Sequence, residues 1–192
     1  MPPSQKFSRE QILQTAYEIA EKEGLEEINA RRIAGELKCS TQPIYHNFST
    51  MRELKEQVME RIIATYTAYM EKGAKEQRAY LGMGMAYIRF ARDYPNFFQE
   101  LFMRESELSP TDFIENNQVG REVICKGRAF TGLTEAEQKE FHLKVWVFTH
   151  GLAALSASNT VNFTDTQIKT LLAETTGEML IGFQNTREQE EK

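Results

Sequence analysis

The chain has 192 residues, of which 41% are hydrophobic and 27% are charged, so it can bury a core and is not expected to be disordered. Its formal net charge of −5 opposes binding to a polyphosphate, so any affinity for nucleic acid must come from local positive charge. The longest apolar run, residues 81–88, is far shorter than the roughly 20 residues of a membrane-spanning helix, and residues 1–6 contain no secretory signal. We therefore expect a cytoplasmic protein with no membrane partner.

The N-terminal part of the chain is expected to form three helices. Ser8 and Gln11 have the spacing of a capping box, in which each side chain accepts a hydrogen bond from a backbone N–H group at the helix start. Asn29 can cap a second, short helix, and Ser40 can cap a third. Pro43 falls in the first turn of that third helix, where its missing N–H removes no intrahelical hydrogen bond.

The rest of the chain is also expected to be helical. Residues 51–72 show the apolar spacing of one long connecting helix. Strand signals are poor, since no Asn-Gly or Asp-Gly turn separates alternating runs. The sequence therefore predicts an all-α fold. Further helices are expected over 75–93 and from Pro95 onward, followed by a loop at 104–112 and a helix that contains Phe113, Ile114, Val119, Val123 and Ile124. The last two helices are expected over 135–157 and 165–185. They begin with the capping boxes Thr134/Glu137 and Thr164/Gln167.

Two short helices after a longer first helix are typical of a helix-turn-helix DNA reader. Local charge supports this interpretation, because residues 28–52 contain four basic residues and one acidic residue, a net charge of +3. In the third helix, Ile44 and Phe48 are spaced to point inward. The remaining side chains would point outward, toward DNA: Thr41, Gln42, Pro43, Tyr45 and His46.

Each outward side chain has chemistry that suits DNA. Gln42 can pair with adenine through two hydrogen bonds, and Thr41 and the Pro43 ring can contact a thymine methyl group. Tyr45 and His46 can donate to phosphates. The alternative interpretation is an ordinary solvated helix of an all-α protein.

At these positions the sequence resembles a known family. Ile33-Ala34-Gly35-Glu36-Leu37, Ser40, Ile44-Tyr45-His46-Asn47-Phe48 and Leu54 are similar to the DNA-binding domain of TetR-type (TetR/AcrR) bacterial transcriptional regulators, and Trp146 to Gly151 resemble a Trp, His-Gly pattern of some members. The resemblance implies a helix-turn-helix domain over 1–50, with its motif at about 30–49, and a larger helical domain over 51–192 that binds an effector and dimerises. It also implies a repressor that binds a palindromic operator as a homodimer.

The family's DNA contacts can be transferred only to matching positions. The resemblance places them at Arg31, Ser40, Thr41, Gln42, Pro43, Tyr45 and His46. Two positions depart from the family. Lys38 stands where the family often has glycine in the turn, so a left-handed backbone there would be strained. Met51 stands where a phosphate-contacting lysine is common, and we assign that role instead to Arg52 or Lys55.

Residues 66–150 are rich in aromatic side chains and methionine, which suits a pocket for a small apolar or aromatic effector whose identity the sequence does not reveal. A plain hydrophobic core explains the same composition equally well. The effector candidates are Tyr66, Met83, Phe90, Phe98, Phe102, Trp146 and His150.

The last two helices are expected to pair across a two-fold axis. The candidate dimer contacts are Gly151, Ala154, Leu155, Leu172, Met179 and Phe183. We expect no catalytic residues, cofactor or metal site, because no known catalytic motif occurs and the histidines and cysteines do not have metal-ligand spacing. An all-helical enzyme or a protein-interaction adaptor are the alternatives.

Overall fold

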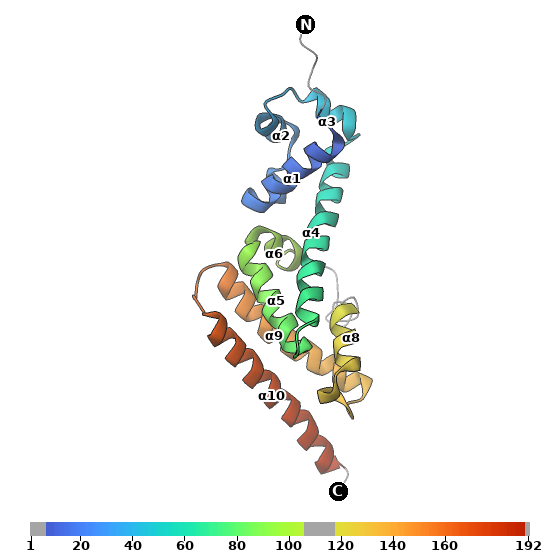
Figure 1. Ribbon diagram of the computed structural model, residues 1–192, viewed down its shortest axis with the longest axis vertical. Helices are drawn as coiled ribbons and strands as arrows, with labels where there is room; N and C mark the ends of the chain where they lie inside the picture. The colour runs from blue at the N-terminus through green and yellow to red at the C-terminus, as the bar shows by residue number, and fades with distance from the viewer. Residues whose placement is uncertain (1–6, 106–117, 191–192) are drawn as a thin grey trace. The chain divides into compact units, whose positions relative to one another are not determined.

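The computed structural model describes residues 7–105 and 118–190, and the described residues form helices joined by turns, without strands (Figure 1). The all-α prediction is therefore confirmed. The expected loop at 104–112 and the residues Phe113 and Ile114 lie largely or wholly outside the described residues. None of the helices in the described ranges is both long and apolar enough to span a bilayer.

The chain divides into two compact units. Unit 1 comprises Met1–Tyr66 and Tyr94–Arg104, and unit 2 comprises Thr67–Asp93 and Glu105–Lys192. The long helix α4, Met51–Ala74, contributes to both units. The domain boundary expected at residue 50 stays a prediction.

Unit 1 contains α1 (Arg9–Glu23), a 3-10 turn (Leu25–Glu27), α2 (Ala30–Leu37), α3 (Gln42–Asn47), the first part of α4 and α6 (Pro95–Phe102). Its capping signals act as the sequence predicts. Ser8 and Gln11 form the capping box of α1, and the Asn29 side chain accepts from the Arg32 N–H at 2.9 Å to cap α2. Gly24 ends α1 with a φ of 101°, a backbone conformation that favours glycine.

The core of unit 1 lies between α1, α2, α3, α4 and α6. Ile12, Ile33, Ile44, Leu54 and Ile62 all have zero exposed area, as their helical spacing predicts. The ring of Phe97 on α6 lies 5.0 Å from the ring of Tyr17 on α1, measured between centroids. The short helices α2 and α3 are thus held against a common apolar centre.

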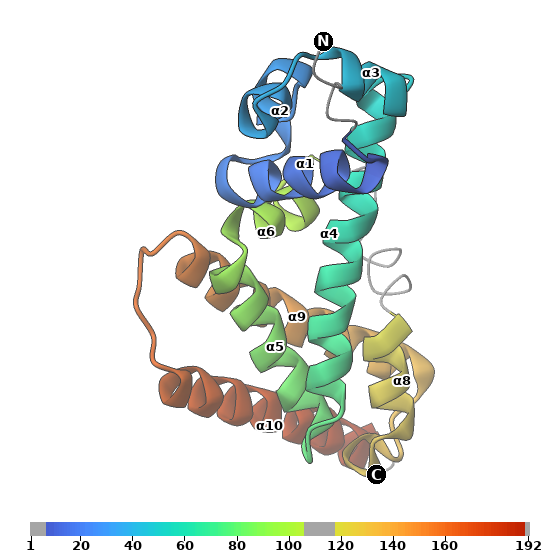
Figure 2. The ribbon, with the colours of Figure 1, turned by 45° about the horizontal axis from the view of Figure 1, so that its top comes forward.

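Unit 2 contains the end of α4, α5 (Ala79–Asp93), α8 (Gln118–Lys126), a 3-10 turn (Arg128–Phe130), α9 (Glu135–Ala157) and α10 (Asp165–Glu190). The helices α5, α9 and α10 pack against one another (Figure 2). Helix α5 begins four residues later than its expected start at 75, because residues 75–78 form a turn.

Local capping and close packing position the helices of unit 2. The expected capping boxes are present at the starts of α9 and α10, where Thr134 pairs with Glu137 and Thr164 with Gln167. Where α4 turns back into α5, a Cβ atom on Gly73 would lie only 2.6 Å from the carbonyl oxygen of Gly82. The two helices can approach this closely because neither glycine has a side chain.

Candidate functional site

Helix α3 is anchored in the core on one side and exposed on the other. Ile44 has no exposed area and Phe48, just after the helix, is 1% exposed, so both anchor the segment in the core. The helix begins at Gln42, and Pro43 lies in its first turn, as predicted. The expected Ser40 cap is wrong: Thr41 occupies the cap position with helical dihedral angles, and its side chain makes no capping hydrogen bond.

The opposite side of α3 faces solvent. Gln42, His46 and Ser40 are exposed, Thr41 and Pro43 are half-buried, and the Tyr45 side chain is 57% exposed. The side chains proposed for base and phosphate contact thus lie on one short segment, next to the two anchors that fix it. Their contact with DNA stays a prediction.

The turn between α2 and α3 contains a strained residue. Lys38 has a φ of 51° and a ψ of 46°, the left-handed conformation that a glycine would adopt more easily. Its N–H donates to the carbonyl oxygen of Gly35 at 3.2 Å and closes the end of α2. The sequence resemblance suggested a left-handed backbone at this position. That backbone is present, with lysine in place of glycine.

Basic side chains around α3 differ in how far they are neutralised. Arg31 is exposed, and Arg52 is 85% exposed with Glu56 at 3.8 Å. Lys55 is more restrained, because its amino group lies 3.3 Å from the carboxylate of Glu26. Arg31 and Arg52 are therefore more exposed than Lys55.

Arg32, which contributes to the positive charge of this segment, is already paired. Its guanidinium lies 2.6 Å from a carboxylate oxygen of Glu23 and 2.6 Å from one of Glu36. Hydrogen bonds to these two acids raise the pKa of Arg32. Arg32 therefore joins α1 to α2, a role that the sequence analysis missed because Glu23 lies on another helix.

The start of α4 is fixed by Glu53. Its carboxylate accepts hydrogen bonds from the Arg9 guanidinium at 2.6 Å and from the Ser49 N–H at 2.8 Å. The bond from Arg9 is the main reason that the pKa of Glu53 is lowered. The Asn47 amide donates to the Pro43 carbonyl oxygen at 2.8 Å, so the end of α3 is held as well. These contacts orient α3 without using its outward side chains.

Three of the seven effector candidates lie in unit 1. The rings of Tyr66 and Phe102 are 5.1 Å apart and those of Phe98 and Phe102 are 5.5 Å apart, measured between centroids. Phe98 has no exposed area, and burial raises the pKa of the Tyr66 hydroxyl. The structure therefore brings these three residues together as an aromatic cluster.

The other four candidates lie in unit 2. Met83 and Phe90 are buried on α5, and Trp146 and His150 are neighbours on α9 with ring centroids 5.1 Å apart. The Tyr87 hydroxyl is hydrogen-bonded to Nδ1 of His150 at 3.0 Å, and burial lowers the pKa of His150. His150 is therefore held by a hydrogen bond to a side chain of its own chain, Tyr87 on α5.

A second hydrogen bond between a tyrosine and a histidine, this one at a buried histidine, was not anticipated. The Tyr80 hydroxyl of α5 is hydrogen-bonded at 2.9 Å to Nδ1 of His142, which is 5% exposed on α9. Burial lowers the pKa of His142 to about 4. The two residues are 62 positions apart in the chain, so only the packing of α5 on α9 brings them together.

The candidate dimer residues occupy different environments. Gly151 and Leu155 are exposed and Ala154 is half-buried. Met179 and Phe183 pack partly against a buried cluster of their own chain. Leu172 is 2% exposed and lies against Gly84, so it belongs to the core of unit 2.

Two exposed apolar residues of the same helices were not anticipated. Val147 on α9 is 57% exposed and Ile181 on α10 is 55% exposed. Val147, Gly151 and Leu155 follow one another at intervals of four residues, a spacing that places them on one face of α9. This spacing was a signal available in the sequence.

Among the described residues, no group of three or more His, Cys, Asp or Glu side chains is placed to hold a metal ion. The two cysteines are free thiols: Cys39 lies half-buried in the turn between α2 and α3, and Cys125 is exposed on α8. They lie in different units.

Comparison with solved structures gives this architecture a class. No protein-family model and no curated protein matches the sequence. A TetR-like transcriptional regulator from Rhodococcus sp. RHA1 matches with a TM-score of 0.63 at 15% identity, over 91% of this chain and 96% of that chain. A protein with unknown function from Rhodococcus sp. RHA1 matches with a TM-score of 0.67 at 18% identity, over 95% and 98% of the two chains.

These similarities define an all-α fold, in which the two short helices α2 and α3 follow α1 near the N-terminus. More particularly, the chain has the fold of a TetR-like transcriptional regulator, as the sequence resemblance predicted.

Proposed function

We propose that the protein is a DNA-binding transcriptional regulator and that α3 is its recognition helix. The observation that supports this best is the two-sided burial of α3, where Ile44 is fully buried while the adjacent Tyr45 is 57% exposed. A helix anchored in this way can enter the major groove without rearranging the core. The likeness of the fold to a TetR-like regulator supports the same function.

Each exposed side chain has a proposed role in this complex. Gln42 reads adenine, Thr41 and Pro43 contact a thymine methyl group, and Ser40, Tyr45 and His46 contact phosphates. Arg31, Arg52 and Lys55 add charge to the phosphate contacts, Lys55 only after it leaves Glu26.

The protein is further proposed to act as a homodimer on a palindromic operator. The exposed apolar residues Val147 and Leu155 of α9 and Ile181 of α10 would be covered by a second copy, and a Cβ atom on Gly151 or Gly177 would meet no atom within 4 Å. An isologous contact of this kind gives two-fold symmetry, which an inverted repeat in the DNA mirrors. Gly151, Ala154 and Leu155 are the central contacts, Met179 and Phe183 contribute their exposed edges, and Leu172 remains in the core.

Repression, and release from DNA by a small apolar or aromatic effector, complete the proposal. The effector side chains are those of Met83, Phe90, Trp146 and His150 in unit 2 and of Tyr66, Phe98 and Phe102 in unit 1. An effector acts only as far as it prefers the state that does not bind DNA, and a coupling of about 1–3 kcal/mol changes DNA affinity roughly 5- to 150-fold.

The test is selection of bound sites from a random double-stranded DNA pool at one fixed salt concentration, followed by sequencing. We expect an inverted repeat whose half-sites are centred about 34–36 Å apart. The Gln42→Ala variant should lose preference at one base pair of each half-site, at a cost of about 1–3 kcal/mol, whereas Gln99→Ala, which removes an exposed glutamine from α6, should select the wild-type motif. Folded protein that enriches no motif would refute the proposal and favour the adaptor or the enzyme.

A further inference from the structure

Unit 2 contains a cavity of about 510 Å³ that the proposed function does not use. It is lined by the end of α4, the turn that follows, α5 and Lys169 of α10, and none of the seven effector candidates is among its lining residues. Part of its lining is apolar, with Met85 and Ala86 buried and Leu81 half-buried. Its volume lies within the roughly 300–1,000 Å³ typical of small-molecule sites.

The charged side chains that line this cavity are mostly positive. Among the residues that the structure describes, Lys72, Arg78, Arg89 and Lys169 line it together with one acidic residue, Glu76. The whole chain has a net charge of −5, so this concentration of positive charge is a local departure from the average. Four cations around an apolar lining favour a ligand that has both an anionic group and an apolar part.

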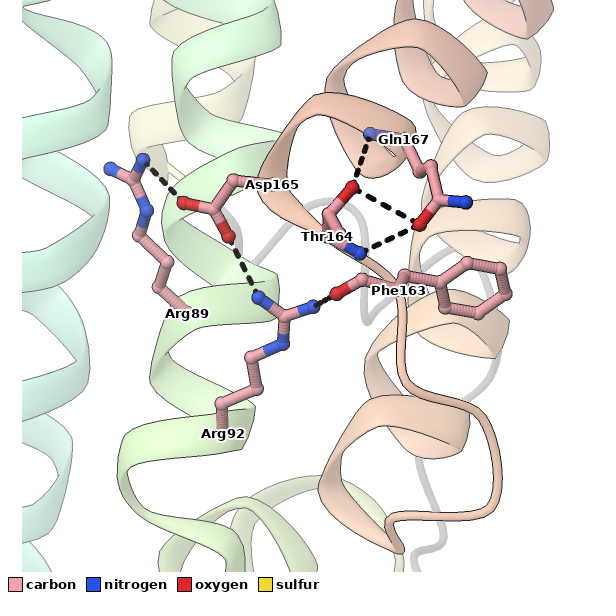
Figure 3. A network of polar contacts seen from close by, with 6 residues as sticks. All are labelled: Arg89, Arg92, Phe163, Thr164, Asp165 and Gln167. Atoms are coloured by element: carbon pink, nitrogen blue, oxygen red, sulfur yellow. Dashed lines mark hydrogen bonds and ion pairs between the residues drawn. The ribbon is translucent and has the colours of Figure 1, made fainter.

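Arg89 can reach a ligand without losing the structure that surrounds it. Asp165, the first residue of α10, lies between Arg89 at 3.2 Å and Arg92 at 2.8 Å, and Arg92 also donates to the Phe163 carbonyl oxygen (Figure 3). If Arg89 turns toward an anion in the cavity, Arg92 still holds Asp165. The longer of the two bonds is therefore the one available for exchange.

We propose that this cavity binds an organic anion, a carboxylate or phosphate with a short apolar body. The anionic group meets Arg89 and Lys169 at the edge of the cavity, and the body lies against Leu81 and Met85. The proposal goes beyond the DNA-binding function and does not depend on it.

Isothermal titration calorimetry of the full chain tests the proposal with three probes: octanoate, 1-octanol and inorganic phosphate. Octanoate should bind about tenfold more tightly than either of the others, because 1-octanol lacks the charge and phosphate lacks the apolar body. If 1-octanol bound as tightly as octanoate, the proposal that the ligand is an anion would be wrong. If inorganic phosphate bound as tightly as octanoate, the ligand would be a free inorganic anion, and the proposed contact with an apolar body would be wrong.

Variants of the residues that line the cavity test whether octanoate binds there. The double variant Arg89→Gln/Lys169→Gln should weaken octanoate about tenfold. The matched control Lys126→Gln/Lys144→Gln removes two exposed lysines of unit 2 that do not line the cavity, and it should keep the wild-type affinity. If both double variants weakened octanoate binding equally, binding would depend on the overall charge of the protein, and the proposal would be wrong.

Asp165 gives a second, opposite test. Asp165→Asn removes the charge that competes for Arg89, so octanoate should bind at least as tightly as to the wild type. Tenfold weaker binding in Asp165→Asn, with unchanged helical circular dichroism, would contradict the exchange at Arg89. None of these measurements involves DNA, so their failure would leave the DNA-binding proposal untouched.

Discussion

The guanidinium of Arg9 donates a 2.6 Å hydrogen bond to the carboxylate of Glu53, which lies 44 positions later in the chain. The same guanidinium lies 4.0 Å from the centroid of the Phe48 ring and donates to the Asn47 carbonyl oxygen. One side chain at the start of α1 thus contacts the end of α3 and the start of α4. The orientation of α3, the proposed recognition helix, therefore depends on a residue that is not itself proposed to touch DNA.

Replacing Arg9 should weaken DNA binding indirectly. Arg9→Gln removes the contacts to Glu53 and Phe48, so α3 is less firmly held, and we expect a loss of about threefold to tenfold in affinity for the selected operator. Fluorescence anisotropy with labelled DNA measures it. Arg128→Gln, which removes an exposed arginine from unit 2, is the matched control, and an equal effect of the two variants would argue against the positioning role.

Lys38→Gly should stabilise unit 1. A left-handed backbone costs a non-glycine residue about 1–2 kcal/mol, whereas glycine loses only about 0.5–1 kcal/mol of chain entropy on folding, so a net gain of up to about 1.5 kcal/mol is expected. Urea unfolding without DNA measures it. Lys22→Gly, in the last turn of α1, should instead destabilise the protein. A destabilised Lys38→Gly variant would contradict the strain argument.

Adjacent residues of α3 should separate stability from binding. Ile44→Ala removes a fully buried side chain and should lower the free energy of unfolding by about 2–5 kcal/mol. Tyr45→Ala truncates an exposed side chain and should change stability little, yet weaken binding to every DNA sequence. Urea titration and anisotropy on both variants give the comparison. Wild-type DNA affinity in Tyr45→Ala would remove Tyr45 from the interface.

A charge on the exposed face of α9 should break the proposed dimer. Val147→Glu and Leu155→Glu each place a carboxylate at an exposed apolar position, where a second copy would bury it without a partner. Analytical ultracentrifugation should show monomers, while Thr170→Glu, at an exposed polar position of α10, should remain dimeric. A wild-type protein that sediments as a monomer yet binds the palindrome tightly would refute the dimer.

Stability should fall in mildly acidic solution because of His142. The unfolded chain takes up a proton on this residue near pH 6.5, whereas the folded chain does so only near pH 4. The unfolded state therefore binds more protons between these values, and the free energy of unfolding should drop by up to about 3 kcal/mol as pH falls through this range.

Urea unfolding at pH 7.5 and pH 5.0 measures this dependence, and His142→Gln should reduce it. Some dependence should remain, since burial also lowers the pKa of His150. Tyr80→Phe keeps His142 buried, so the free energy of unfolding should depend on pH almost as strongly as in the wild type. If the free energy of unfolding of His142→Gln depends on pH as strongly as that of the wild type, another titratable group causes the dependence.

The sequence predicted features that depend on residues a few positions apart. The capping boxes at Ser8 and Thr134, the Asn29 cap and the position of Pro43 are all present, because each is decided within one turn of helix. The alternation of buried Ile44 and exposed Tyr45 follows from the helical repeat in the same way.

Contacts between distant residues were beyond such reasoning. Arg32 counts as free positive charge in the sequence, but Glu23 neutralises it once α1 packs on α2. The Tyr80 and His142 pair exists only because α5 packs on α9. The predicted Ser40 cap failed for a local reason, since Ser40 and Thr41 are both capable of capping and the backbone of Thr41 is already helical.

The distribution of the two cysteines has a practical consequence. Cys39 lies in unit 1, in the turn before α3, and Cys125 lies in unit 2, and the sequence contains no third cysteine. Donor and acceptor dyes can therefore be attached through maleimide chemistry without adding or removing a residue. Energy transfer between them would follow the separation of the two units, first as operator is added and then as octanoate is titrated in.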